Sequence, residues 1–250
     1  MAESKKDYQA SPDLLKDRII LVTGAGAGIG AAAAKSFAAH GATVILLGRT
    51  TRKLEEVYDA IEAAGYPQPA IYPMNLEGAS AEDYVNLAET IEKEFGRLDG
   101  ILHNASMLGT LTPLSQYDLK QWGKVMQVNL HAPYLMTRAC LELLKKSDDA
   151  SVVFTSSSVG RKGRAYWGAY GITKAAIENM MQIWADELET NTNIRINSLN
   201  PGATRTTMRA KAYPGEDPNT LPKPEEIMAA YLYLIGPDSK GSTGQQFDAQ

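Results

Sequence analysis

Short apolar runs alternate with longer amphipathic stretches along the whole chain of 250 residues. The run Ile19–Val22 is rich in β-branched side chains and follows polar residues, which is typical of a buried strand. Strands of this kind, separated by helical stretches with no break in composition, predict βαβ units and a parallel sheet. We expect strands near residues 18–23, 43–48, 70–74, 99–103, 151–156, 194–199 and 245–248, and the longest helices near 115–146 and 169–190.

The pattern therefore predicts the α/β class: one domain over residues 1–250, with three layers and helices on both faces of a seven-stranded parallel sheet. Two segments depart from the alternation. Residues 1–16 form a polar amino-terminal extension. Residues 203–225 are rich in proline and follow the sixth predicted strand, where a substrate lid is expected; an ordinary surface excursion is the alternative.

A glycine-rich turn follows the first predicted strand. The segment Thr23–Gly30 reads Thr-Gly-Ala-Gly-Ala-Gly-Ile-Gly and leads into the alanine-rich stretch 31–39. Without side chains the backbone can approach a pyrophosphate, and a helix start offers free N–H groups and a positive dipole end. Strand, glycine turn and helix in this order, as in a Rossmann-type fold, predict a phosphate-binding site, although a plain tight turn would also accept these glycines and the G-x-G-x-x-G spacing does not fit.

Three residues form a candidate acid/base group. Tyr170 and Lys174 are four residues apart, so they share a helix face. A neighbouring ammonium favours a phenolate, and we therefore expect Lys174 to lower the pKa of Tyr170. Ser157, at the end of a predicted strand, is placed to hold a substrate oxygen. The group predicts alcohol–ketone chemistry; the alternative is that Tyr170 and Lys174 are surface neighbours on an amphipathic helix.

With its Thr-Gly-x-x-x-Gly-x-Gly spacing and this trio, the chain resembles the short-chain dehydrogenase/reductase family from about residue 17 to 248. Asn104-Ala105 occupies the place of the family's Asn-Asn-Ala-Gly turn, and Asn129 matches the asparagine of its catalytic tetrad. Asn200-Pro201-Gly202 matches the turn that borders the nicotinamide. The wider context at 155–161 and 247–250 is most similar to the YciK-like bacterial oxidoreductases.

The resemblance implies a site. Catalytic residues would be Ser157, Tyr170, Lys174 and Asn129, with Asn129 anchoring a water that resupplies the proton through Lys174. Cofactor-binding residues would be Thr23, Gly24, Gly26, Gly28, Ile29, Gly30, Arg49, Asn75, Leu76, Asn104, Ala105, Tyr170, Lys174, Pro201, Gly202 and Thr204. Two positions depart from the family: Ser106 replaces the glycine of its turn, and Asn75-Leu76 stands where an aspartate usually touches the adenine.

The second predicted strand ends in Gly48-Arg49-Thr50, and no acidic residue lies between Gly30 and Glu55. A carboxylate at this place would hold the ribose 2′-hydroxyl of NAD, whereas an arginine can bind the 2′-phosphate of NADP. The alternative for Arg49 is a solvated loop arginine. We therefore expect NADP(H) in preference to NAD(H). Ala27 argues the other way, because many NADP-using relatives carry a basic residue at that position.

The predicted function is an NADP(H)-dependent oxidoreductase that interconverts a small-molecule carbonyl compound and its primary or secondary alcohol, with Tyr170 as general acid/base. A non-catalytic NADP-responsive regulator and an epimerase or dehydratase on the same fold are the alternatives. Cations flank the trio at Arg161, Lys162 and Arg164, and others follow on the proposed lid at Arg205, Arg209 and Lys211. They indicate either an anionic substrate or a solvated basic loop.

Composition excludes several other classes. A net charge of −4 and the lack of a basic arm argue against nucleic acid as a partner. No apolar run is long enough for a membrane span or a signal peptide, so a cytoplasmic protein is expected. The three histidines lack ligand spacing, which predicts no metal site, and the single Cys140 has no partner for a disulfide. The resemblance further implies a homodimer or homotetramer built on the two long helices.

Overall fold

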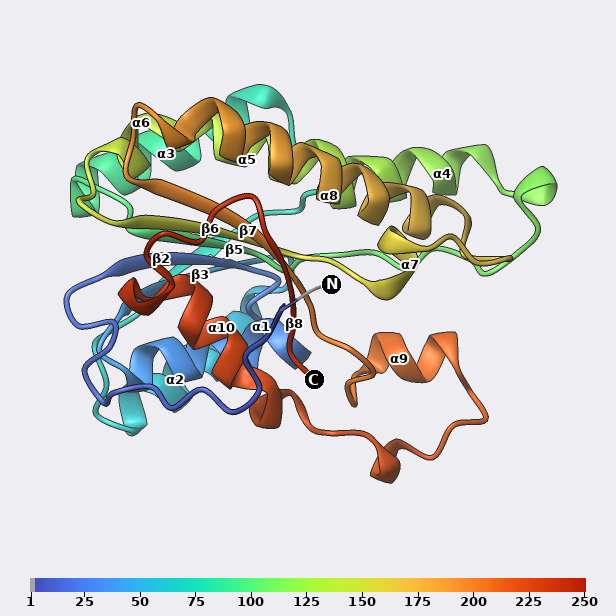
Figure 1. The fold of residues 1–250 in the computed structure, drawn as a ribbon, viewed down its shortest axis with the longest axis horizontal. Helices are drawn as coiled ribbons and strands as arrows, with labels where there is room; N and C mark the ends of the chain where they lie inside the picture. Colours follow the sequence, from blue (N-terminus) through green and yellow to red (C-terminus); the bar gives the residue numbers. More distant parts are fainter. Residues whose placement is uncertain (1–2) are drawn as a thin grey trace.

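In the computed structural model, which describes residues 3–250, one parallel sheet runs through the centre of the molecule (Figure 1). Its eight strands follow the order β1-β8-β7-β6-β5-β2-β3-β4. They are β1 (Glu3–Ser4), β2 (Ile19–Thr23), β3 (Thr43–Gly48), β4 (Ala70–Pro73), β5 (Gly100–His103), β6 (Ala150–Thr155), β7 (Ile194–Asn200) and β8 (Gln246–Asp248). The predicted α/β class and the parallel sheet are confirmed.

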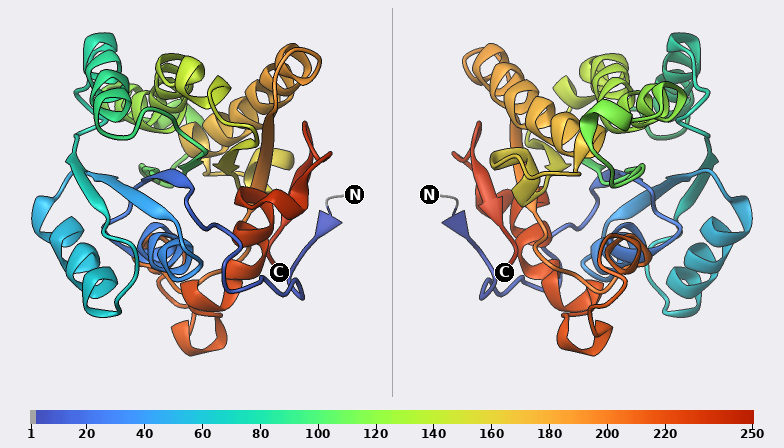
Figure 2. Two further views of the ribbon diagram at one scale, coloured as in Figure 1. Left: turned by 90° about the vertical axis from the view of Figure 1, so that its left-hand side faces the viewer. Right: turned by 90° about the vertical axis from the view of Figure 1, so that its right-hand side faces the viewer.

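Helices cover both faces of this sheet, as Figure 2 shows from its two ends. One layer holds α1, α2 and α10, and the other holds α3, α4, α5, α6 and α8. The helices are α1 (Gly28–Ala39), α2 (Thr51–Ala63), α3 (Ala81–Phe95), α4 (Leu119–Met126), α5 (Ala132–Ala139), α6 (Leu141–Lys145), α7 (Ser158–Arg161), α8 (Gly168–Glu189), α9 (Thr207–Ala212) and α10 (Met228–Ile235).

Two hydrophobic cores lie between these layers. Ile20 and Val22 of β2 pack into the core beneath α1 and α10, whereas Leu21 packs into the core beneath α3 and α8. Successive strand residues point to opposite faces. A strand buried on both faces therefore needs a continuous apolar run, which is why these strands could be predicted from the sequence.

The expected strand number was wrong by one. The additional strand β1 lies in the 1–16 extension and pairs in parallel with β8; Met1 and Ala2 are outside the described residues. This extension packs on the fold through Tyr8, whose ring lies 5.3 Å from that of Tyr233 and whose hydroxyl donates to Asp238 at 2.7 Å. A strand of two residues carries no periodic pattern, so its pairing depends on these distant contacts.

The single helix expected near 115–146 is also wrong. The segment is divided into α4, a π-helical turn at Gln127–His131, α5 and α6. Pro133 stands at the start of α5 and lacks an N–H group for the helix ladder. π-Helical turns are frequent at functional sites, and this one carries Asn129.

The strand order determines where a ligand can bind. From β2 the chain continues outward to β3 and β4, and then returns to place β5 on the other side of β2. The connections after β2 and β5 therefore leave the sheet in opposite directions, which opens a crevice at their carboxyl ends. The glycine turn and Asn104 lie at these two ends.

Candidate active site

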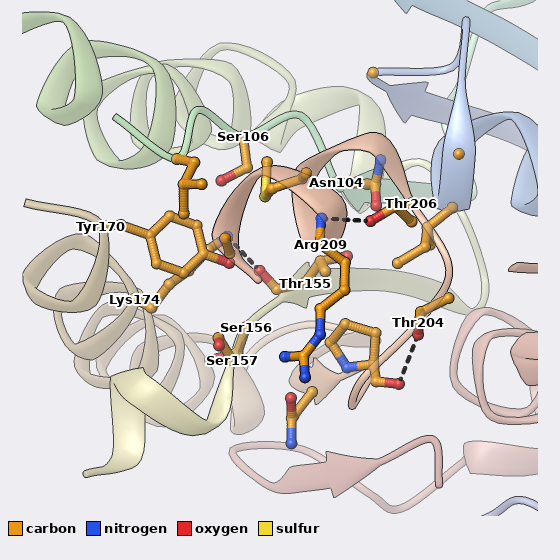
Figure 3. A pocket seen from close by; sticks show the side chains of 18 of the residues that line it. Asn104, Ser106, Thr155, Ser156, Ser157, Tyr170, Lys174, Thr204, Thr206 and Arg209 are labelled. Carbon is orange, nitrogen blue, oxygen red and sulfur yellow. Dashed lines mark hydrogen bonds between the residues drawn. The ribbon is translucent and has the colours of Figure 1, made fainter. Parts of the chain in front are cut away.

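A cavity of about 330 Å³ lies at the carboxyl ends of β2, β5, β6 and β7, beside α9 (Figure 3). It brings together most of the residues predicted from the sequence. Its lining includes Gly24, Gly28, Ile29, Asn104, Ala105, Ser157, Tyr170, Lys174, Pro201, Gly202 and Thr204.

The glycine turn packs directly against the first turn of α1. A Cβ atom at Gly30 would lie 2.2 Å from the carbonyl oxygen of Gly24, a distance that folded proteins do not tolerate. Ala27 caps α1 without a side-chain hydrogen bond, and the first turn has no acidic residue. The N–H groups at this end are thus left for a ligand, and the positive end of the helix dipole favours an anion. These residues fit the pyrophosphate of a dinucleotide.

Thr23 joins the two strand ends that border the crevice. Its Oγ1 accepts from the backbone N–H groups of Asn104, at 2.9 Å, and Ala105, at 3.0 Å. Thr23 is buried and contributes no surface to the cavity lining. It therefore positions the β5 turn, and its predicted contact with the cofactor stays a prediction.

Tyr170 and Lys174 project from α8 into the cavity, and Ser157 follows β6 (Figure 3). Lys174 Nζ donates to the carbonyl oxygen of Thr155 at 2.7 Å and lies 5.6 Å from the centre of the Tyr170 ring. Both side chains are buried. The interpretation of Tyr170 and Lys174 as ordinary surface neighbours is therefore wrong.

The expected direction of the tyrosine pKa is not found. Burial raises the pKa of Tyr170 to about 12, while the Ser157 hydroxyl lowers it by a smaller amount. Removing a phenolate from water disfavours the charged form more strongly than its neighbours favour it. At neutral pH Tyr170 is thus protonated, which is the state that a proton donor needs. Burial also lowers the pKa of Lys174 to about 8, against a smaller raising effect of Glu178.

Asn129 lies behind the cavity rather than in its lining. Its Oδ1 accepts from the Met107 N–H at 2.7 Å, and its Nδ2 donates to the Met107 carbonyl at 2.9 Å and to Thr173 Oγ1 at 3.2 Å. The side chain thus fastens the irregular segment after β5 to α8. Its predicted role in anchoring a water stays a prediction.

Some of the predicted cofactor residues lie away from the lining. Arg49 is exposed at the end of β3, and Asn75 is exposed in a turn where its Oδ1 accepts from the Glu77 N–H. Leu76 is part of the core. A Cβ atom at Gly26 would lie 3.0 Å from Cβ of Lys53, so this glycine lets the turn approach α2.

Three of the six cations that suggested an anionic substrate, all of them arginines, have protein partners. Arg161 binds Asp248 at 2.9 Å, and Arg209 binds both carboxylate oxygens of Glu216 at 2.6 Å while stacking 3.7 Å from the Tyr213 ring. Arg205 donates to a backbone carbonyl. The exposed cations Lys162 and Arg164 contribute nothing to the lining.

The lining contains residues that sequence reasoning missed. An apolar wall consists of Leu108, Trp167, Met208 and Ala212. Outside the lining, Gln250 holds the turn after β7, because its Nε2 donates to the Pro201 carbonyl at 2.7 Å. These residues come from separate parts of the chain and match no motif; the only signal was the lid prediction for 203–225, which Met208 and Ala212 support.

A model of the short chain dehydrogenase family matches residues 18–217, most of the chain. The chain belongs to this family. An oxidoreductase named YciK from Escherichia coli K12 is 51% identical over 97% of this chain and 96% of its own. The structure of a short chain dehydrogenase from Pseudomonas syringae is 61% identical, covers 98% of this chain and 99% of its own, and superimposes with a TM-score of 0.96.

Another short chain dehydrogenase structure, from Escherichia coli CFT073, is of a complex with NADPH. It is 52% identical, covers 96% of this chain and 99% of its own, and has a TM-score of 0.93. The chain is thus an oxidoreductase of the short chain dehydrogenase family, and the expected similarity to YciK-like proteins is confirmed.

No helix within residues 3–250 is long and apolar enough to cross a membrane. No three His, Cys, Asp or Glu residues in this range are grouped to hold a metal ion.

Proposed function

We propose that this protein is an NADP(H)-dependent oxidoreductase that reduces an uncharged carbonyl compound to its alcohol, and runs the reverse reaction. The observation that carries the proposal is the shared cavity of Ser157, Tyr170, Lys174 and the Gly24–Gly28 turn. A proton donor, a cation and a phosphate-binding helix end are the parts that such a reaction needs.

The preference for NADP(H) is supported by Arg49, which is exposed at the end of β3 next to the glycine turn. A guanidinium can bind a 2′-phosphate through charge-assisted hydrogen bonds. The complex of the Escherichia coli CFT073 relative with NADPH supports the same choice. Gly24, Gly28, Ile29, Asn104, Pro201, Gly202 and Thr204 would line the rest of the cofactor site.

The mechanism assigns one role to each catalytic side chain. When bound, the nicotinamide supplies the hydride for reduction. Ser157 donates a hydrogen bond to the substrate carbonyl oxygen and holds it beside the Tyr170 hydroxyl. Tyr170, protonated at neutral pH because burial raises its pKa, gives its proton to that oxygen. Lys174 stabilises the phenolate that forms and would hold the nicotinamide ribose. In the oxidative direction Tyr170 accepts the proton.

An uncharged substrate is favoured by the substrate side of the cavity. Trp167, Leu108 and Met208 offer apolar surface there, and the Trp167 ring lies 5.7 Å from that of Tyr170. The one guanidinium in the lining, that of Arg209, is paired with Glu216. A substrate carboxylate would need to displace that partner before it could bind.

Cofactor binding is the first test. Isothermal titration with NADPH and NADH should give tighter binding of NADPH, and Arg49→Ala should weaken NADPH binding by about ten-fold to 100-fold, as expected for a lost charge-assisted contact of 1.5–3 kcal/mol. Arg52→Ala is the matched control, because Arg52 is exposed in the first turn of α2 and pairs with Glu56. Equal affinity for the two cofactors would refute the NADP(H) assignment.

The substrate class is tested with a ketoester and its free ketoacid. Wild type should reduce the ester with the higher kcat/KM. Glu216→Gln should release Arg209 and raise activity toward the acid, while Trp167→Ala should raise KM for the ester. A wild type that prefers the acid would contradict the proposed substrate class.

The alternative functions predict no net oxidation of NADPH, unlike the proposed reductase. A regulator would bind NADPH without oxidising it in the presence of any carbonyl compound. An epimerase or dehydratase would act on its substrate without net NADPH oxidation. A homodimer or homotetramer and a cytoplasmic location stay predictions. Exposed apolar side chains on α5 and α8, namely Tyr134, Ile172 and Ile183, support self-association.

A further inference from the structure

A row of alternating charges lies behind the catalytic lysine. Glu178 follows Lys174 by one turn of α8, and both are at least 95% buried. Arg161 Nε lies 3.5 Å from Glu178 Oε1, and Arg161 Nη1 lies 2.9 Å from Asp248 Oδ1. The row thus runs from the active site to β8, in the order Lys174, Glu178, Arg161 and Asp248.

Glu178 is held in place by groups from two other elements. Its Oε2 accepts from Ser198 Oγ of β7 at 2.5 Å. Its Oε1 and Arg161 Nε are both buried and, within residues 3–250, neither has a hydrogen-bond partner, so they face each other as charges at 3.5 Å. The other buried acidic residue of the described chain, Asp99, directly precedes β5, at the amino ends of the strands and away from the cavity. Glu178 is therefore the buried carboxylate that belongs to the catalytic side.

Arg161 is fixed from the other end of the row. Its Nη2 donates to the Phe247 carbonyl at 2.9 Å, and its partner Asp248 also accepts from Asn200 Nδ2 at 2.8 Å. The preceding Gly160 lets α7 lie against Lys174, because a Cβ atom there would come within 2.8 Å of Lys174 Cβ. Packing thus directs this arginine inward instead of toward a substrate.

Lys174 needs a countercharge because its ammonium is removed from water. Nζ donates to the Thr155 carbonyl, a neutral acceptor, and in the described structure it forms no direct ion pair with Glu178. The carboxylate acts on it across one helix turn, where low solvent content leaves the attraction weakly screened. Consistent with this, Glu178 raises the pKa of Lys174 against the larger lowering effect of burial.

We propose that Glu178 is a positioning residue for this site: its carboxylate, held by Ser198 and Arg161, keeps the buried Lys174 ammonium charged. Arg161, 3.5 Å from Glu178, is a second cation on this carboxylate and offsets part of its effect on Lys174. The inference rests on the proposed oxidoreductase function only for its consequence in turnover, since a neutral Lys174 would no longer stabilise the Tyr170 phenolate.

The other titratable groups around Lys174 add no buried anion. Tyr170 on α8 and Tyr231 on α10 are protonated, because burial raises the pKa of each phenol. His103 on β5 is neutral, because burial and the charge of Lys174 lower its pKa to about 3. Asp248 on β8 is partly exposed and is bound by Arg161 and Asn200.

The test is an NMR titration of the whole protein carrying lysine labelled with 13C at Cε, with the Lys174 signal assigned by its loss in Lys174→Arg. Wild type should titrate near pH 8. Glu178→Gln should titrate about one pH unit lower, since a neighbouring opposite charge shifts a pKa by 1–3 units. Glu178→Asp should restore most of the difference. Glu187→Gln, an exposed change on the same helix, should leave the titration unchanged.

Arg161→Met provides an independent arm, since it removes a cation next to Glu178 and should move the Lys174 titration to higher pH. A merely structural role would weaken both variants without moving the titration in opposite directions. The proposal is overturned if Lys174 in Glu178→Gln titrates within about 0.3 pH units of wild type. If Glu178→Gln fails to fold, the proposal is overturned when Arg161→Met leaves the Lys174 titration at the same pH or moves it to lower pH.

Turnover gives the second readout. The alkaline limb of the NADPH-dependent kcat/KM profile should begin at lower pH in Glu178→Gln, by the same interval as the NMR titration. The NMR experiment needs neither substrate nor cofactor. A protein that reduces no carbonyl compound would therefore refute the proposed function and leave the assignment of Glu178 open to its own test.

Discussion

Gly30→Ala should disrupt the glycine turn more than any other single methyl group placed there. The new Cβ would lie 2.2 Å from the Gly24 oxygen and 2.7 Å from Asn104 Nδ2, where ordinary contact begins at 3.4 Å. The turn and α1 must therefore part by more than 1 Å. Gly24 is held at φ +68° and cannot absorb the change by a side-chain rotation. We expect a loss of about 3 kcal/mol in the free energy of unfolding, the upper end for overpacking.

Ligand binding should suffer as well, because the N–H groups of this turn would no longer converge. Losing one hydrogen bond to a charged group removes about 1.5–3 kcal/mol, so the Kd for NADPH should rise by about ten-fold to 100-fold. Urea unfolding and isothermal titration measure the two effects separately.

Two other glycines serve as controls. Gly78→Ala makes the same chemical change in open space and should leave both quantities unchanged. Gly28→Ala should lower the free energy of unfolding by about 1 kcal/mol, an effect between those of the other two variants. Its φ of +55° is strained for alanine, but the atom nearest to the new Cβ is 3.6 Å away. A Gly30→Ala protein with wild-type stability and NADPH binding within three-fold of wild type would refute the packing argument.

Three further outcomes are expected. Tyr170→Phe should reduce NADPH-dependent turnover by about 100-fold to 10,000-fold, the range for a lost general acid, while its Kd for NADPH stays unchanged in the same titration. In wild type, the reductive kcat/KM should be level below pH 8 and fall above it, because Lys174 loses its charge as the pH rises through its pKa of about 8; a profile level up to pH 10 would contradict this. His103→Gln should lessen the acid sensitivity of folding. The native pKa of about 3 lies below the unfolded value of about 6.5, so the unfolded state of the wild type binds a proton that the native state does not, and stability is lost as the pH falls below 6.5. Between neutral pH and pH 5, the free energy of unfolding measured in urea should fall by about 2 kcal/mol more in the wild type than in the variant. Equal decreases would show that His103 takes up its proton in the native state.

Local pattern predicted the parts of the fold that depend on near neighbours in the chain. Strands such as β2 and β6 are buried on both faces, so their apolar runs could be recognised without knowledge of their partners. The two-residue β1 could not, because its pairing depends on contacts of Tyr8 with residues more than 200 positions away. The helix expected over 115–146 failed for a similar reason: a break at Asn129 is stabilised by bonds to Met107 and Thr173.

The shift in the pKa of Tyr170 likewise combines an effect that spacing in the sequence predicts with one that only packing determines. The sequence places a lysine one helix turn away, and from this spacing alone a lowered pKa follows. How deeply the phenol is buried depends on the packing of α8 beneath the segment after β5 and beside Trp167. Desolvation proved larger than the effect of neighbouring groups, and its size could not be obtained from spacing.

By itself the sequence determined the α/β class, the glycine turn, and the presence of Ser157, Tyr170 and Lys174 as a chemical group. These features arise from side-chain periodicity and from fixed short spacings, and each such pattern is contained in one continuous stretch of the chain. Only the tertiary structure decided that Arg161 turns inward to Glu178 and Asp248, and that Trp167 and Met208 form one apolar wall. A cation or an aromatic ring has no role until its neighbours are known, because the same side chain can bind a substrate, balance a buried charge or cover a core.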